Sequence, residues 1–311
     1  MDKFIQSIEL IYGKDISFIE EFDTGNYGTS LKVLIDGKTY VMKIIPRDET
    51  GRIEVLLPIL KHINQQGVSV PGPIVTDDGR YMCQTLYNGK EMSVYVYPLL
   101  EGKNLENLFD KVVNKGYMYD LGKELANLHK SMNEYDECIE KLPSWENAEG
   151  LFVIYEEIHK DIPNEVIAMY DKYISELKAA NLKMNQLIHG DMHMANIVVD
   201  KLNSFKFIDM EECMYGNCMM DIAILVFDIP VVCSDETMSK KGIQDLLRGY
   251  NSVNEISFKE SSTIPLMLKI LEVASYINYY RYKDSSDIWL HKFYNNRGKR
   301  ILNQETYFEY N

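Results

Sequence analysis

The stretch LIHGDMHMANIVVD, residues 187–200, places two histidines, an aspartate and an asparagine between two short apolar runs. The runs QLI and IVV have the length and composition of short strands, and the polar residues would form the loop between them. A third apolar run, FKFID at 205–209, follows a Leu-Asn-Ser turn and also ends on an aspartate. Loops held by such a scaffold often carry function.

The spacing of the polar residues predicts phosphoryl transfer. Asn196 follows Asp191 by five residues, and Asp209 lies at the end of the next predicted strand, which is the spacing of the kinase catalytic apparatus. Asn196 and Asp209 offer the hard oxygen ligands that Mg²⁺ prefers. Asp191 is placed to orient a hydroxyl group and accept its proton. Gly190 allows a tight backbone turn beside it.

The same loop also allows a second interpretation. His189, Asp191 and His193 alternate along an extended segment, so all three could bind a metal ion in a hydrolase. We interpret the histidines as structural residues that orient the loop, and keep the metal-dependent hydrolase as an alternative.

Composition and charge restrict the possible partners and the cellular compartment. The chain has 311 residues, a net charge of -14 and five cysteines. It shows no basic stripe, so nucleic acid and anionic membrane surfaces are poor partners. An odd number of cysteines in a long chain argues against a disulfide framework. The amino-terminus lacks a signal-peptide pattern and no apolar run is long enough to cross a bilayer, so we expect a cytoplasmic protein.

The distribution of apolar residues predicts an α+β protein with two domains. Residues 1–97 are rich in predicted strands, with hairpin signals at Asp36-Gly37 and Asn88-Gly89. Residues 98–311 are mostly helical by periodicity and contain the polar loop. We therefore expect a small nucleotide-binding lobe, 1–97, followed by a larger helical lobe, 98–311.

The first lobe contains candidates for a phosphate-binding site. Lys43 lies within the apolar strand YVMKII, where a buried ammonium group needs an anion. Glu54, on the helix that follows, is the expected partner of Lys43, with Glu49 as the alternative. Gly25 and Gly28 form a modest glycine loop whose backbone N–H groups could cover phosphates.

These motifs, in this order, resemble the aminoglycoside phosphotransferase/choline kinase family. The resemblance rests on YVMKII (40–45), HGDMHMAN (189–196), FIDMEEC (207–213) and DIAIL (221–225), and it covers nearly the whole chain. It implies a bilobal protein-kinase-like fold with a small antiparallel-sheet lobe and a larger helical lobe. It also implies ATP or GTP as the phosphate donor and Mg²⁺ as the metal.

The resemblance assigns roles to individual residues. It implies that Asp191 is the catalytic base, that Asn196 and Asp209 bind Mg²⁺, and that Lys43 with Glu54 holds the triphosphate. The resemblance also implies that Asp221 supports the catalytic loop and that the backbone near Tyr97 and Leu99 meets the base. His189, by its place in the loop, would support the loop as well.

The acceptor is predicted from charge alone. Carboxylates near the catalytic loop, Glu211, Glu212 and Asp228, would suit a cationic acceptor such as an aminoglycoside or an amino alcohol. The resemblance implies a second role for Glu211, because it matches the second acidic residue of the family's Ile-Asp-x-Glu/Asp pattern and could support a second metal ion. We therefore predict a small-molecule kinase. The alternative is a nucleotide-binding regulatory or assembly protein of the same fold with little catalysis.

Overall fold

The structure is a computed structural model that describes residues 1–22, 28–135, 142–146, 162–233 and 235–282. The chain divides into two compact units, each built from several segments. The first, which we call the sheet unit, contains Met1–Asn104, Lys130–Leu142 and Ile197–Glu211. The second, the helical unit, contains Leu105–His129, Pro143–Asn196 and Glu212–Asn311. Segments from later in the chain join the sheet unit, so the two units are not separated at a single point of the sequence. The predicted domain boundary between residues 97 and 98 stays a prediction.

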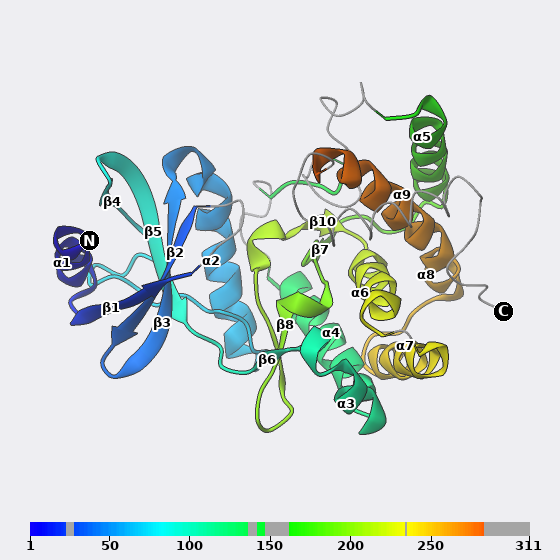
Figure 1. Ribbon diagram of the computed structural model, residues 1–311, viewed down its shortest axis with the longest axis horizontal. Coiled ribbons are helices and arrows are strands. Elements are labelled where there is room, and N and C mark those ends of the chain that lie inside the picture. Colours follow the sequence, from blue (N-terminus) through cyan, green and yellow to red (C-terminus); the bar gives the residue numbers. More distant parts are fainter. Residues whose placement is uncertain (23–27, 136–141, 147–161, 234, 283–311) are drawn as a thin grey trace. The chain divides into compact units, whose positions relative to one another are not determined.

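A five-stranded antiparallel sheet in the order β1-β2-β3-β5-β4 forms the centre of the sheet unit (Figure 1). Its strands are β1 (Ile16–Glu21), β2 (Thr29–Ile35), β3 (Lys38–Pro46), β4 (Cys83–Tyr87) and β5 (Lys90–Pro98). Two of the connections are two-residue turns. Asp36 and Gly37 have φ angles of 49° and 75°, and Asn88 and Gly89 have 51° and 77°. Positive φ at both positions matches the twist of a hairpin, so both predicted hairpins are confirmed.

The two faces of this sheet differ in character. One face carries Leu31, Met42 and Val94, which pack with helix α1 (Asp2–Tyr12) into a buried apolar core. The opposite face carries Val41, Lys43 and Ile45, as strand alternation requires. Helix α2 (Thr50–Gln65) lies across the sheet from α1 in Figure 1. Strand β3 therefore places Lys43 on the face of the sheet opposite the α1 core.

Short strands flank the polar loop 189–196 along the chain. In the sheet unit, β6 (Lys103–Asn104), β8 (Ile197–Val199) and β9 (Phe205–Phe207) form a three-stranded sheet. In the helical unit, β7 (Gln186–Ile188) pairs with β10 (Met214–Gly216). The three short strands predicted around the loop are confirmed as β7, β8 and β9.

The helical unit is built around long helices. Helix α9 packs against α5 and α6, and α6 also packs against α7 (Figure 1). These helices are α5 (Asn164–Ala179), α6 (Cys218–Val232), α7 (Glu236–Asn251) and α9 (Ile264–Tyr282). Pro265 lies in the first turn of α9, where a missing N–H costs nothing. The remaining described helices of four or more residues are α3 (Phe109–Asn114), α4 (Met118–Asn133) and α8 (Phe258–Ser261).

The expected α+β class is confirmed, with one correction to the local structure. The region 1–97, predicted to be rich in strands, begins with a helix, because α1 buries Phe4, Ile5, Ile8 and Tyr12 along one face. Among the described helices, none combines the length and the apolarity needed to cross a membrane.

Candidate active site

The catalytic-loop candidate runs from His189, just after β7, to Asn196, which ends a short 3-10 turn. Gly190 has φ +85°, and a Cβ atom there would clash with the carbonyl oxygen of Glu212. Both the backbone angle and the close approach therefore require glycine. The loop turns sharply at this residue and presents Asp191 immediately after it.

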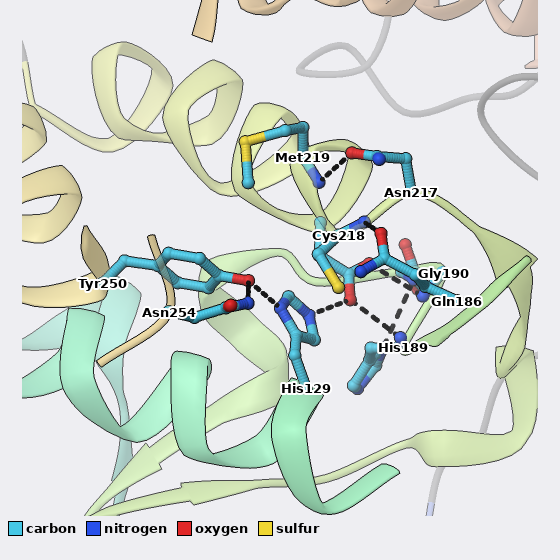
Figure 2. Close-up of polar contacts among 11 residues, drawn as sticks. His129, Gln186, His189, Gly190, Asn217, Cys218, Met219, Tyr250 and Asn254 are labelled. Carbon is cyan, nitrogen blue, oxygen red and sulfur yellow. Dashed lines mark hydrogen bonds and ion pairs between the residues drawn. The ribbon is translucent and has the colours of Figure 1, made fainter. Parts of the chain in front are cut away.

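Asp221, in the first turn of α6, holds the start of the loop. Its carboxylate accepts hydrogen bonds from the backbone N–H groups of His189 (2.7 Å) and Gly190 (2.9 Å). The side chain is fully buried. Asn217 caps the same helix through a hydrogen bond from the Met219 N–H, which fixes the start of α6 (Figure 2).

A buried chain of polar side chains continues from Asp221 within the helical unit. His129 Nε2 lies 2.9 Å from Asp221 Oδ2, and His129 Nδ1 lies 2.8 Å from the Tyr250 hydroxyl (Figure 2). The Asn254 amide donates to the same hydroxyl at 2.9 Å. Sequence reasoning missed His129 and Tyr250. The signal was present, because His129 follows Leu125 by one helical turn within an apolar stripe.

The charge of His129 is set by competing effects. Burial alone would lower its pKa, but Cys218, Tyr250 and the hydrogen bond to Asp221 together hold the pKa well above the ordinary value. An imidazolium at this point neutralises the buried carboxylate of Asp221. Asp221 can therefore hold the loop as a buried carboxylate, because His129 compensates its charge.

Asp191 is ionised and held in place. Its Oδ2 lies 3.3 Å from both Asn196 Nδ2 and His193 Nε2, and its side chain is 31% exposed. Burial would raise the pKa of Asp191, but hydrogen bonding to His193 and the neighbouring charges hold the pKa below the ordinary value. A partly exposed, ionised carboxylate can orient a hydroxyl group and accept its proton.

The orientation of Asn196 suits a cation ligand. Its amide nitrogen donates to the Asp191 carbonyl oxygen at 2.9 Å as well as to the Asp191 carboxylate. Both donors are directed at Asp191, so the amide oxygen is the group that remains for a hard cation such as Mg²⁺.

His189 has a structural contact that the hydrolase interpretation does not use. It is fully buried, and its Nδ1 accepts a hydrogen bond from the Asp191 N–H at 3.2 Å. Within the described residues, no group of three or more histidine, cysteine, aspartate or glutamate side chains is arranged to hold a metal ion. The arrangement therefore gives the three-ligand site no support.

Asp228 and Glu212, two of the proposed acceptor contacts, lie beside the same loop. Asp228 Oδ2 accepts a hydrogen bond from the Met194 N–H at 2.8 Å, so this carboxylate also positions the loop. Glu212 is half-buried, and its carbonyl oxygen faces Gly190. Contact of either side chain with an acceptor stays a prediction.

A second cluster of charged side chains lies in the sheet unit. Lys43 Nζ is 3.3 Å from Glu211 Oε1 and 3.8 Å from Asp209 Oδ1. The Tyr95 hydroxyl donates to Glu211 Oε1 at 2.8 Å. Burial alone would raise the pKa of Glu211, but the Lys43 ammonium and the hydrogen bonds lower it to about 2. Lys43 and its counter-ions thus form a compact ion cluster.

Asp209 has an unusual backbone. Its φ angle is +60°, which is uncommon for a residue other than glycine, although aspartate tolerates it better than most. Its side chain is 54% exposed, three times as exposed as that of Glu211 at 18%. More than half of this carboxylate is therefore open to solvent, and binding of Mg²⁺ by Asp209 stays a prediction.

The partner of Lys43 differs from the one expected. Glu54 is exposed on α2, whereas Ile53 and Leu57 on the same helix are buried. Residues 54 and 57 are only about 60° apart around a helix, so Glu54 lies at the edge of the buried face of α2, with its side chain exposed. Glu211, and not the predicted Glu54, is the glutamate whose carboxylate pairs with Lys43. The side chain of Glu49, the alternative, lies outside the described residues.

The glycine loop is described only at its end. Gly25 lies outside the described residues. Gly28 has φ +75°, and a Cβ atom there would clash with the Ile44 carbonyl oxygen on β3. Gly28 is therefore required for the loop to enter β2, whatever it contributes to phosphate binding.

The segment expected to meet the base follows β5. Tyr97 pairs with Val41 in the sheet, and the Leu99 N–H donates to the Thr39 carbonyl oxygen at 3.0 Å. This bond occupies the N–H donor of Leu99. Contact between this segment and a base stays a prediction, in which Leu99 would use its carbonyl oxygen.

Comparison with known proteins identifies the family. The model of the phosphotransferase enzyme family matches residues 19–253. A homoserine kinase of Neisseria meningitidis serogroup B (strain ATCC BAA-335 / MC58) is 22% identical over 268 residues, which are 80% of this chain and 81% of the relative.

Solved structures agree on the fold. Amicoumacin kinase hAmiN, in complex with AMP-PNP, Ca²⁺ and Ami, has a TM-score of 0.81 and 18% identity, covering 99% of this chain and 95% of its own. A microcompartment-associated aminopropanol kinase has a TM-score of 0.66 and 14% identity, covering 98% of both chains. The expected kinase-like fold is therefore confirmed. Because the family model covers well over half of the sequence, this chain belongs to the phosphotransferase enzyme family and is a phosphotransferase.

Proposed function

We propose that this enzyme is a kinase that transfers the terminal phosphoryl group of ATP or GTP, bound with Mg²⁺, to a hydroxyl group of a small cationic molecule. The observation that carries the proposal is the arrangement of Asp191. Its ionised carboxylate is held by Asn196 and His193 on a loop that is braced through Asp221.

Four residues have distinct roles in the proposed reaction. Asp191 orients the acceptor hydroxyl and takes its proton as the oxygen attacks phosphorus. Lys43 binds the phosphates of the nucleotide. Asn196 and Asp209 would hold Mg²⁺ through oxygen atoms, and the metal supplies charge neutralisation at the phosphates.

Two observations support a cationic acceptor. The chain carries a net charge of -14, which attracts cations. One similar structure is that of an aminopropanol kinase, whose named substrate is an amino alcohol. Aminoglycosides and amino alcohols are therefore the first classes to test.

Release of ADP or GDP in the presence of single acceptors tests the proposal. Candidate acceptors are aminoglycosides, choline, ethanolamine, aminopropanol, homoserine and methylthioribose, each with Mg²⁺ or with EDTA. We expect one class to stimulate turnover in the presence of Mg²⁺. The Asp191→Asn enzyme should lose at least about 100-fold in kcat while its nucleotide affinity stays within about twofold, since a positioned general base contributes that much. Absence of nucleotide binding by the wild-type enzyme would reject the proposal.

A further inference from the structure

One face of the five-stranded sheet carries a row of three polar side chains. Ser30 on β2 lies directly opposite Lys43 on β3, and Lys43 lies directly opposite Tyr95 on β5. Directly opposed residues of antiparallel strands point to the same face of a sheet. The other face is the apolar core that packs against α1. Ser30 therefore shares the face of the lysine proposed to bind phosphates.

The members of this row differ in their hydrogen bonds. Tyr95 donates to Glu211, and Lys43 forms ion pairs with Glu211 and Asp209. The Ser30 hydroxyl is buried, with the residue 2% exposed, and it has no hydrogen-bond partner among the described residues. Buried hydroxyl groups almost always have a partner, because an unpaired one loses its hydration without compensation.

The position of Ser30 makes an unpaired hydroxyl informative. On the opposite face of β2, Leu31 and Val33 are apolar and fully buried. Ser30 is equally inaccessible to solvent but carries a polar group. An alanine at residue 30 would fit the same space without the cost of a buried hydroxyl. The serine is explained if something that is absent from the free chain pairs with it.

We propose that Ser30 is a nucleotide-binding residue whose hydroxyl donates a hydrogen bond to an acceptor atom of the bound nucleotide. The inference rests on the proposed function, because it takes the Lys43 face as the nucleotide-binding face. Ribose and phosphate oxygens are both acceptors that a short hydroxyl beside Lys43 can serve. Binding of the nucleotide then supplies an acceptor for a hydroxyl that has no partner among the described residues.

The test compares two substitutions that remove a buried, unpaired hydroxyl from the sheet unit. Ser30→Ala removes the hydroxyl beside Lys43. Tyr12→Phe removes the Tyr12 hydroxyl, which is also buried without a partner among the described residues but lies on the α1 side of the sheet. Dissociation constants for Mg-ATP, adenosine and Mg-tripolyphosphate are measured by calorimetry, and the Tm of each nucleotide-free protein is measured alongside.

We expect both substitutions to leave Tm unchanged or raise it. Only Ser30→Ala should weaken Mg-ATP binding, by roughly two- to tenfold, as the loss of one hydrogen bond predicts. If Ser30→Ala also weakens the binding of adenosine, the hydroxyl contacts the nucleoside. If it also weakens the binding of Mg-tripolyphosphate, the hydroxyl contacts the phosphates.

Two contrary results are distinguishable. If wild-type protein binds Mg-ATP and Ser30→Ala binds it equally tightly, the role of Ser30 is rejected and the kinase proposal stands. If wild-type protein binds no nucleotide, both proposals are rejected.

Discussion

Lys43 is paired with Glu211, at 3.3 Å, and not with a residue of helix α2. Both residues belong to the sheet unit, and Tyr95 anchors the same carboxylate oxygen. The ammonium group proposed to bind phosphates is thus held by a carboxylate that is itself anchored by Tyr95. Nucleotide phosphates would have to compete with Glu211 for this ammonium group.

The first prediction concerns acid stability. The pKa of Glu211 is lowered to about 2 from 4.5, so its stabilising contribution is complete above about pH 4.5 and is lost as pH falls toward 2. Glu211→Gln should therefore lower the free energy of unfolding by about 2 to 3 kcal/mol at pH 7, and by less at pH 3. Urea unfolding at both pH values measures the difference. A gap between the two proteins that does not narrow at pH 3 would contradict this ion pair.

The second prediction concerns Glu54. Because its side chain is exposed on α2, Glu54→Gln should change KM for the nucleotide and kcat by less than about twofold, as surface substitutions usually do. Lys43→Met is the matched comparison and should raise the nucleotide KM by at least tenfold, since it removes the charge proposed to bind the phosphates. Steady-state kinetics checks both. A large fall in kcat or a large rise in the nucleotide KM of Glu54→Gln would instead support a pair between Glu54 and Lys43, as the sequence predicts.

Much of the local structure could be predicted because its signals are local. Asp36-Gly37 and Asn88-Gly89 each specify a two-residue turn with two positive φ angles, and the structure has both. The spacing of Asp191 and Asn196 within one loop is also a local property. Their direct contact at 3.3 Å follows from a single turn of 3-10 helix.

The rest depends on contacts between distant segments. Glu54 was assigned from its distance along the chain, which does not say which face of α2 meets the sheet. Glu211 reaches Lys43 only because 197–211 joins the sheet unit. His129 and Tyr250 are 121 residues apart, and nothing in either local sequence indicates that they meet. Helix α1 was missed although Phe4, Ile8 and Tyr12 follow a helical period.

The third prediction concerns the buried chain from Tyr250 to Asp221. His129→Leu leaves the fully buried Asp221 carboxylate without its imidazolium, so the free energy of unfolding should fall by about 3 kcal/mol. Tyr250→Phe removes one hydroxyl that contacts His129 and Asn254, so the loss should be about 1 kcal/mol. Urea unfolding of each protein at pH 7 provides the measurement.

Tyr12→Phe is the control for Tyr250→Phe. Both tyrosines are buried, but the Tyr12 hydroxyl has no partner among the described residues, so its removal should be neutral or stabilising. Equal effects of the two tyrosine substitutions would show that the hydrogen bonds of Tyr250 contribute nothing to stability.

The last prediction separates two constraints on Gly190. Gly89 and Gly190 have similar backbone angles, φ +77° and +85°, but a Cβ atom at Gly89 meets nothing within 4 Å, whereas one at Gly190 clashes with the Glu212 carbonyl oxygen. Gly89→Ala should therefore cost about 1 kcal/mol of stability, from backbone strain alone, and leave kcat unchanged. Gly190→Ala must also displace the backbone beside Asp191, so it should cost more stability and lower kcat by at least tenfold, because small displacements of a catalytic group are costly. Urea unfolding and steady-state kinetics of the two proteins check this difference. Similar behaviour of both would mean that the loop tolerates a side chain at residue 190, and that its close approach to Glu212 does not position Asp191.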